Sequence, residues 1–227
     1  MSSKKAVVLL SGGLDSTTCA YLAKHEGYKV YALSFDYGQR LVREIESAKK
    51  VAAAVGVAEH LVMKFDLGMW GGSALTSDID VPTGHVAAPT IETTRIPVTY
   101  VPGRNMIFLS LGVSYAEAIG ADKVFIGVNS IDYSGYPDCR PEFVQAMQKA
   151  IDLGTKAGVE GKGIHVEAPL LMLTKAGIIE LGTRVGVDYS LTWSCYQGGE
   201  KPCGACDSCL LRRKGFQECG RVDPIDV

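Results

Sequence analysis

Short apolar runs alternate with longer segments of helical periodicity along the chain. The short runs are rich in Val, Leu, Ile or Phe and are bounded by turn residues, so they predict buried strands at residues 4–10, 28–35, 57–65, 123–128 and 165–169. Apolar residues recur at helical spacing in other segments, which predicts helices over residues 14–26, 39–55, 105–119, 143–151 and 174–185. This alternation predicts an α/β fold, a parallel sheet with helices on both faces.

The loops that follow the predicted strands are the places to look for a ligand, because open parallel sheets bind ligands beyond the carboxyl ends of their strands. The longest of these loops, residues 66–104, has no sustained periodicity. So long a loop is uncommon unless it serves a site or moves, and we expect part of it to be disordered without a ligand. From Ser190 the pattern changes to turns and cysteines. We therefore expect a main domain over residues 1–189 and a small C-terminal segment over residues 190–227.

Composition and charge exclude several classes of protein. The chain is 47% hydrophobic and 21% charged, a globular balance that excludes a disordered or collagen-like chain. Its net charge of −2 argues against a large nucleic-acid surface. No apolar run reaches the roughly 20 residues of a membrane span. The N-terminal apolar run is short and lacks a signal-peptide cleavage pattern, so we expect a cytoplasmic protein with no membrane or nucleic-acid partner.

The first predicted loop carries the string Ser-Gly-Gly-Leu-Asp-Ser at residues 11–16, between a strand and a helix. Two glycines permit a tight turn and a close approach to a ligand, and the N–H groups and dipole of a helix N-terminus favour an anion. The hydroxyls of Ser11, Ser16 and Thr17 can add hydrogen bonds, and Asp15 can cap the helix or hold a metal ion. An ordinary glycine turn with a helix cap is the alternative. The string is not a Walker loop, because the chain has no Gly-Lys-Ser/Thr triplet.

Five of the seven cysteines lie in the last 33 residues. Cys195, Cys203, Cys206 and Cys209 have the spacing of a tetrahedral zinc site, in which each sulfur lies about 2.3 Å from the metal. Four protein ligands leave no open position, so such a zinc is structural. An iron–sulfur cluster and disulfides are the alternatives. The basic run over residues 210–214 follows, and we interpret it as a solvated helix end.

Two other loops carry groups suited to a flat, charged ligand. Arg104 precedes a predicted helix, where its planar fork can contact a phosphate or a carboxylate. The loop over residues 128–140 combines tyrosines, which stack on heterocycles, aspartates, which accept from a guanine-like edge, and an arginine for a carboxylate. A solvated arginine and an Asp–Arg pair without a ligand are the alternatives. The binding candidates in the loop are Asp132, Tyr133, Ser134, Tyr136, Asp138 and Arg140.

The string at residues 11–16 resembles the pyrophosphatase loop of the N-type ATP pyrophosphatases, in which a nucleophile attacks the α-phosphate of ATP. With residues 35–39, 101–105 and 132–143 and the four-cysteine tail in this order, the chain is similar nearly end to end to the 7-cyano-7-deazaguanine synthases of queuosine biosynthesis. The resemblance implies an adenine nucleotide alpha hydrolase-like, Rossmann-like sheet with a small C-terminal zinc appendage. It also implies a homodimer.

The resemblance further implies an ATP-dependent C–N ligase that uses Mg²⁺ and structural Zn²⁺. Its substrates are 7-carboxy-7-deazaguanine and ammonia, and its product is the nitrile, formed through adenylate and amide intermediates. The residues implied for the nucleotide are Leu10, Ser11, Gly12, Gly13, Leu14, Asp15, Ser16, Thr17, Phe35, Tyr37 and Gln39. The catalytic candidates are Asp15, Ser16, Arg104 and Lys175, of which the two cations suit transition-state charge. Arg104 is also a substrate-binding candidate, and a plain surface lysine is the alternative for Lys175.

Two other functions remain open at this point. A tRNA-thiolating enzyme shares the loop but needs a sulfur carrier and an RNA-binding surface, and Cys139 is the plausible carrier outside the tail. A nucleotide-binding zinc adaptor without chemistry is the second alternative. Product release separates the three, because an adaptor makes no AMP and a thiolating enzyme needs tRNA and a sulfur donor.

Overall fold

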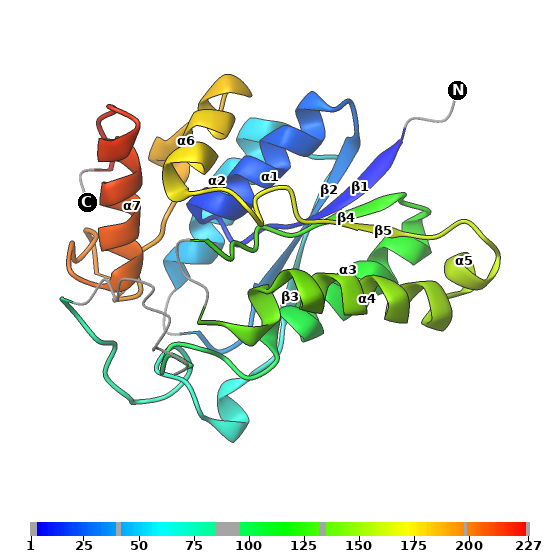
Figure 1. The fold of residues 1–227 in the computed structure, drawn as a ribbon, viewed down its shortest axis with the longest axis horizontal. Helices are drawn as coiled ribbons and strands as arrows, with labels where there is room; N and C mark the ends of the chain where they lie inside the picture. Colours follow the sequence, from blue (N-terminus) through cyan, green and yellow to red (C-terminus); the bar gives the residue numbers. More distant parts are fainter. Residues whose placement is uncertain (1–3, 40–41, 85–95, 132–134, 198, 226–227) are drawn as a thin grey trace.

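A single parallel sheet forms the centre of the molecule (Figure 1). The structure is a computed structural model that describes residues 4–39, 42–84, 96–131, 135–197 and 199–225. The strand order is β3-β2-β1-β4-β5, and all four pairings are parallel. The strands are β1 (Lys5–Leu9), β2 (Lys29–Asp36), β3 (Glu59–Lys64), β4 (Lys123–Phe125) and β5 (His165–Glu167). Each lies within a predicted strand or within one residue of it, which confirms the predicted parallel sheet.

Helices cover both faces of the sheet (Figure 1). The α-helices are α1 (Leu14–His25), α2 (Val42–Val55), α3 (Arg104–Ile119), α4 (Pro141–Gly154), α5 (Lys156–Val159), α6 (Lys175–Arg184) and α7 (Asp207–Glu218). Three short 3₁₀ turns are η1 (Gly68–Trp70), η2 (Pro137–Cys139) and η3 (Tyr189–Leu191). One apolar core lies between the sheet and α3 and α4, and the other between the sheet and α1, α2 and α6.

Strand β1 explains why the strands are continuous apolar runs. Val7 and Leu9 pack into the core beneath α3, whereas Ala6 and Val8 pack into the core beneath α1 and α2. A central strand of a parallel sheet is buried on both faces, so every position along it favours an apolar side chain. Strand β4 is shorter than predicted. Beyond Phe125 the chain runs close to the start of α1, where a Cβ on Gly127 would lie 2.9 Å from the Ser16 nitrogen.

The long segment between β3 and α3 is better anchored than its sequence indicates. Leu67, Leu75 and Val101 are buried in the core under α3. Its turn at Thr83 forms an isolated antiparallel bridge with Cys206, and the Gly84 N–H donates to the Ala205 carbonyl at 2.9 Å. The predicted disorder falls on this segment, of which residues 85–95 lie outside the described part of the chain. That expectation stays a prediction.

The basic run over residues 210–214 is not simply a solvated helix end, so that interpretation is wrong at Arg212. This side chain lies in α7 and is 1% exposed. Its guanidinium donates to both carboxylate oxygens of Asp223, at 2.6 and 2.8 Å, and to the Thr192 hydroxyl at 2.7 Å. The tail therefore contains a complete helix, α7, which packs against α6. A buried ion pair between Arg212 and Asp223 holds this helix to the end of the chain.

Breaking this ion pair should destabilise the fold strongly. Arg212→Met leaves the Asp223 carboxylate buried without its partner, and such a change typically costs about 3–5 kcal/mol. We expect a loss of that size in the free energy of unfolding, measured by urea denaturation. Lys214→Met is the matched control, because Lys214 is exposed on the same helix and its contact with Glu218 is a surface pair. Equal stability of the two variants would contradict the assignment.

The structure describes helices in residues 4–39, 42–84, 96–131, 135–197 and 199–225. Among them, no helix is both long and apolar enough to cross a bilayer.

Candidate active site

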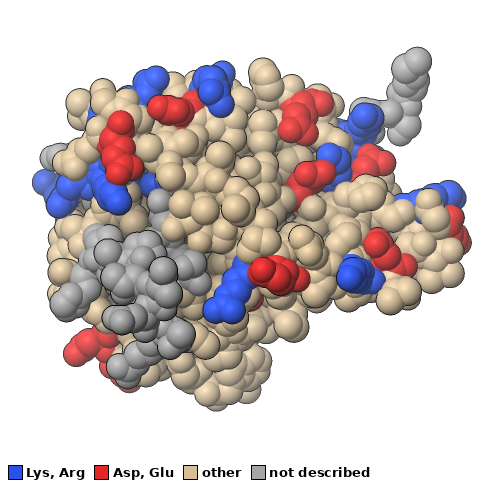
Figure 2. Space-filling view, in the orientation of Figure 1, with Lys and Arg blue, Asp and Glu red and all other residues tan. Residues whose placement is uncertain are grey.

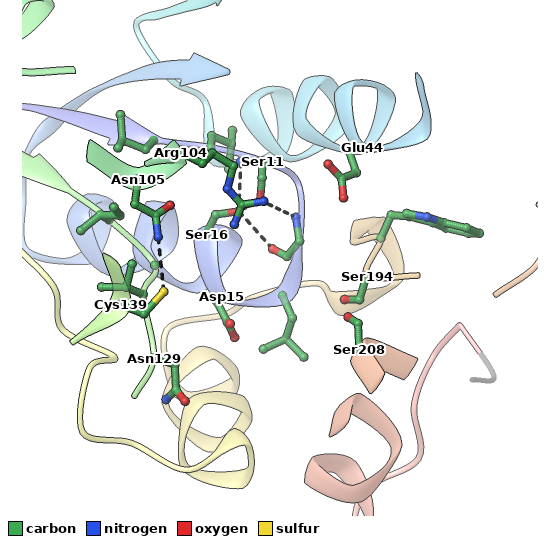
Figure 3. Close-up of a pocket in the computed structure, with 18 of the residues that line it drawn as sticks. Ser11, Asp15, Ser16, Glu44, Arg104, Asn105, Asn129, Cys139, Ser194 and Ser208 are labelled. Carbon is green, nitrogen blue, oxygen red and sulfur yellow. Dashed lines mark hydrogen bonds between the residues drawn. The ribbon is translucent and has the colours of Figure 1, made fainter. Parts of the chain in front are cut away.

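A cavity opens at the carboxyl ends of β1, β2 and β4, where the sequence predicts a site (Figure 3). Its floor is the loop between β1 and α1. Its walls come from the end of β2, the first turns of α2 and α3, the loop after β4, and α6. The C-terminal segment closes one side with Trp193, Ser194, Tyr196, Asp207 and Ser208. Segments far apart in the sequence therefore share one cavity.

The loop over residues 11–16 is a compact turn that is held by its own serine hydroxyls. The Ser16 hydroxyl accepts from the Ser11 N–H at 3.2 Å and lies 2.9 Å from the Ser11 hydroxyl. Gly13 is the N-cap of α1 and has no side chain to accept a hydrogen bond from the first N–H groups of the helix, which is where an anion can bind. Of the nucleotide-binding candidates here, the ones that line the cavity are Leu10, Ser11, Gly13, Leu14, Asp15 and Ser16.

The two remaining candidates of the loop lie behind this surface. Thr17 is fully buried in α1, and its hydroxyl has no hydrogen-bond partner among the described residues. Gly12 has a φ of +80°, and a Cβ there would lie 2.4 Å from the Ala48 nitrogen and 2.6 Å from the Glu44 carbonyl oxygen of α2. Gly12 is thus required for the close packing of the loop against the backbone of α2.

Gly12→Ala should destabilise the protein for two separate reasons. An L-residue with positive φ costs about 1–2 kcal/mol, and the contacts with Ala48 and Glu44 add a clash with backbone that cannot yield cheaply. Gly27→Ala isolates the first cost, because Gly27 has a φ of +84° with nothing within 4 Å of its Cβ position. Thermal denaturation should place Gly12→Ala well below Gly27→Ala in melting temperature. A smaller loss for Gly12→Ala would show that the loop does not depend on this contact.

Asp15 and Lys175 form an ion pair at the bottom of the cavity. The Lys175 ammonium donates to Oδ1 and Oδ2 of Asp15 at 2.7 and 2.8 Å. Thr174 caps α6 by accepting from the Gly177 N–H, which places Lys175 at the first helical position. Asp15 does not cap α1. The fold therefore joins two of the predicted catalytic residues, 160 positions apart in the chain, in a partly buried contact.

The end of β2 supplies an aromatic wall. The Phe35 ring stacks on the Phe108 ring with centroids 4.0 Å apart. The Tyr37 hydroxyl accepts from the Arg104 guanidinium at 3.3 Å. Gln39 folds back on the same turn, where its side-chain Oε1 accepts from the Tyr37 N–H at 2.7 Å. Phe35, Tyr37 and Gln39 all line the cavity, and Gln39 also fixes the shape of its own loop.

Arg104 begins α3 and extends its guanidinium into the cavity (Figure 3). Burial by itself would lower the pKa of the Arg104 guanidinium. The nearby oxygens of Tyr37 and Tyr136 outweigh this effect and raise the pKa. Arg104 thus stays cationic and offers a planar fork to an anion. Asn105 follows it and lines the cavity as well.

The loop after β4 divides into residues that reach the cavity and residues that do not. Tyr136 lines it, with its hydroxyl 2.7 Å from the Thr99 hydroxyl. Asp138 is buried behind it and accepts from the Asn105 N–H at 2.9 Å, so it orients the start of α3. Arg140 is exposed at the N-terminus of α4 and is not part of the cavity lining. The candidates Asp132, Tyr133 and Ser134 lie outside the described residues.

Cys139 lines the cavity beside Asn105, whose side-chain amide donates to its sulfur at 3.3 Å (Figure 3). Burial and the neighbouring Asp138 raise the pKa of the Cys139 thiol to about 12. The reactive form of a cysteine is the thiolate, so a protonated thiol is a poor sulfur carrier at neutral pH. This environment counts against the tRNA-thiolating alternative.

Several cavity residues are not among those that the sequence analysis names. They include Glu44, which lies in the first turn of α2, and the residues contributed by the cysteine tail. Burial raises the pKa of Glu44 to about 7, although Arg104 acts in the opposite direction. The sequence offers one partial clue to Glu44, its place just after the loop that ends β2.

The four predicted metal ligands come together beside this cavity. The sulfur atoms of Cys195, Cys203, Cys206 and Cys209 all lie within 4.8 Å of one another. The Sγ atoms of Cys203 and Cys209 are 4.0 Å apart, and all four cysteines are free thiols. Backbone N–H groups of Gln197 and Cys203 donate to the Cys195 sulfur at 3.3 Å each. Four sulfurs at this separation fit the tetrahedral shell of zinc, and none of them forms a disulfide.

Charged side chains are mixed over the face seen in Figure 2, and neither sign dominates it. The figure gives no sign, on this face, of the broad basic surface that binds long nucleic acids.

Comparison of the sequence with known families settles the membership of the chain. The family model described as "Queuosine biosynthesis protein QueC" matches residues 5–220. The chain belongs to the QueC family. A QueC relative from Trichodesmium erythraeum, named 7-cyano-7-deazaguanine synthase, is 56% identical over 97% of this chain and 99% of its own length. One of the same name from Acetivibrio thermocellus is 58% identical over 98% of this chain and 97% of its own.

Solved structures share the QueC fold at low sequence identity. NMN synthetase from Francisella tularensis aligns with a TM-score of 0.50 and 15% identity, over 97% of this chain and 79% of that one. A 4-thiouridine synthetase in complex with RNA and ATP aligns with a TM-score of 0.52 and 16% identity, over 96% of this chain and 50% of that one. These likenesses support the predicted adenine nucleotide alpha hydrolase-like fold.

Proposed function

We propose that this QueC-family chain converts 7-carboxy-7-deazaguanine, ammonia and ATP into 7-cyano-7-deazaguanine, AMP and pyrophosphate. One observation carries the proposal: relatives that are 55–58% identical over nearly the whole chain bear the name of this synthase. The cavity supports it, because an anion-binding loop and a cationic, aromatic wall face the same space. An enzyme that activates a flat carboxylic acid with ATP needs both.

The nucleotide is proposed to lie on the loop over residues 11–16, with its base beside Phe35 and Tyr37. The N–H groups of the loop and the positive end of α1 stabilise the pyrophosphate. Carboxylate oxygens are the ligands that Mg²⁺ prefers, so Asp15 would hold the ion, which would neutralise phosphate charge. Lys175 then exchanges its contact with Asp15 for one with the phosphates, where it stabilises charge that develops as pyrophosphate leaves.

The heterocycle and its carboxylate are proposed to occupy the wall between α3 and the loop after β4. Arg104 pairs with the carboxylate and Tyr136 contacts the ring face. Asp132, Tyr133, Ser134 and Arg140 stay candidates for the rest of the substrate. Asp138 contributes by holding Asn105 and with it the start of α3.

Two activations in one site account for the nitrile. The substrate carboxylate attacks the α-phosphate and releases pyrophosphate, so the acid oxygen leaves later as part of AMP. Ammonia displaces AMP and gives the amide. The amide oxygen is then adenylated in the same way, and loss of AMP and of both protons on the nitrogen gives the nitrile. Acid and amide differ by one small group, so one cavity suits both steps.

We further propose a structural Zn²⁺ on Cys195, Cys203, Cys206 and Cys209, which would hold the segment over residues 190–227 against the domain over residues 1–189. A cytoplasmic homodimer without nucleic-acid partners is part of the same proposal.

Incubation of the purified protein with ATP, Mg²⁺, ammonium and 7-carboxy-7-deazaguanine tests the function. Mass spectrometry should detect the amide and then the nitrile, with AMP formed in step. AMP without nitrile would indicate another acid on the same fold. No AMP from folded, zinc-loaded protein would favour an adaptor, and a requirement for tRNA and a sulfur donor would favour thiolation.

A further inference from the structure

Glu44 is a cavity carboxylate that the steps described above do not use. It lies in the first turn of α2, and its carbonyl oxygen packs against Gly12, so its backbone is fixed to the phosphate loop. Figure 3 shows its side chain reaching from α2 into the cavity, with Arg104 on one side and the hydroxyls of Ser194 and Ser208 across from it. Arg104 donates to Tyr37 and acts on Glu44 as a nearby charge.

The other acids and bases described in the cavity are committed or poorly suited to proton transfer near neutral pH. Asp15 is held by Lys175 through both oxygens here and would hold Mg²⁺ when the nucleotide is bound. Burial raises the pKa of the Cys139 thiol to about 12 and raises the pKa of the Tyr136 hydroxyl as well. Asp207 lies between two cysteines of the proposed zinc shell. Burial raises the pKa of Glu44 to about 7, where it can accept and release a proton at similar cost.

The proposed reaction needs a proton acceptor after each activation. Ammonium must lose one proton to become the nucleophile, and the nitrogen loses a second as the C–N bond forms, the C–O bond to AMP breaks and the amide appears. In the second half, the amide nitrogen loses one proton as its oxygen is adenylated and the C=N bond forms, and it loses the other as the C–O bond to AMP breaks and the third C–N bond forms. In both halves the proton comes from nitrogen at the same carbon.

We propose that Glu44 is the catalytic base that removes protons from the substrate nitrogen, first in amide formation and then in nitrile formation. The inference rests on the proposed function and adds a residue to it. The charged and titratable groups that line the cavity around Glu44 are Arg104 of α3, Tyr37 at the end of β2, Tyr136 and Cys139 of the loop after β4, Tyr196 of the C-terminal segment, Asp207 and Arg212 of α7, and Asp15 of α1 with Lys175 of α6. Arg104 is the neighbour that favours the ionised carboxylate.

Glu44→Gln tests the role by separating activation from amination. Activation moves no proton to a base, so exchange of labelled pyrophosphate into ATP in the presence of the acid should stay within about threefold of wild type. Ammonium-dependent amide formation should fall by about 10²–10⁴-fold, the usual contribution of general-base catalysis. KM for the acid should change little. Hydroxylamine, which is largely uncharged at neutral pH, should be used far better than ammonium by the variant.

The pH dependence gives a second readout. In wild type at saturating ammonium, the rate of amide formation should rise as pH increases through about 7, because the base works only when ionised, and then level off. In Glu44→Gln the rate should instead track the free ammonia and keep rising above this range. Glu46→Gln is the matched control, because Glu46 is exposed on the same helix. Glu44→Asp, which keeps a shortened carboxylate, should recover part of the rate.

Three results would overturn the role. Loss of pyrophosphate exchange in folded Glu44→Gln would place Glu44 in nucleotide binding. A raised KM for the acid with an unchanged amination rate would make Glu44 a contact of the heterocycle. An unchanged pH profile would assign the proton to another group. If wild type and Glu46→Gln make no amide at all, the proposed function fails instead.

Discussion

Lys175→Met is expected to lower the rate of acid-dependent AMP formation by about 10²–10³-fold, the usual cost of removing one preorganised charge from a developing negative centre. Lys175 is the ammonium that holds both oxygens of Asp15. Methionine keeps the apolar part of the lysine side chain. This part packs against Gly215 of α7, where a Cβ atom would lie only 2.6 Å from the Lys175 Cγ. The loss should therefore appear in catalysis more than in folding.

Quenched-flow measurement of AMP, together with thermal denaturation, checks this prediction. Lys64→Met serves as the control, because Lys64 is an exposed lysine whose contact with Asp36 lies on the surface. It should leave the rate unchanged. If Lys175→Met forms AMP within severalfold of wild type, the cation that assists pyrophosphate release must be another residue, and the Asp15 contact is only structural.

Cys206→Ser is expected to release the metal and to abolish activity. Cys206 is fully buried, belongs to the four-sulfur cluster and begins the turn that leads into α7. Loss of a structural metal is among the few single changes that cost more than about 4 kcal/mol. The cavity wall formed by Ser194, Tyr196 and Ser208 depends on the same segment, so substrate binding should be lost with it.

Metal analysis and urea denaturation of the purified variant provide the measurement. Cys219→Ser is the matched control, because among the described residues Cys219 lies outside the cluster, and its thiol donates to the Phe216 carbonyl. It should keep one zinc per chain and near-wild-type stability. Iron with visible absorbance in the wild type would instead indicate an iron–sulfur cluster, and a fully stable, active Cys206→Ser would remove the structural role.

The sequence predicts those features that depend on local pattern. Continuous apolar runs such as β1 predict strands that are buried on both faces of the sheet. The string over residues 11–16 predicts a tight turn, because its glycines and hydroxyl side chains are close neighbours in the sequence. The four cysteines can be recognised as metal ligands from the sequence, because their short spacing allows the chain to bring all four sulfurs together. In each case the signal lies in one short stretch of the sequence, of no more than 15 residues for the four cysteines.

Features that depend on tertiary packing were missed. Arg212 has the sequence context of a solvated helix end, yet Asp223 and the packing of α7 on α6 bury it. Glu44 reaches the cavity only because Gly12 allows α2 to pack against the phosphate loop. Asp138, a substrate candidate by residue type, is turned toward Asn105 by the start of α3. Side-chain direction of this kind is set by partners in other elements, from 11 residues away for Arg212 and Asp223 to 33 residues away for Asp138 and Asn105.

The most direct test of the account is the ratio of AMP to nitrile measured with the acid and with the amide as separate substrates. Two activations in one site predict two AMP per nitrile from 7-carboxy-7-deazaguanine and one AMP per nitrile from the corresponding amide. Lys175→Met should slow both reactions together. One AMP per nitrile from the acid, or an amide that is not converted, would contradict the proposal that this cavity performs both steps.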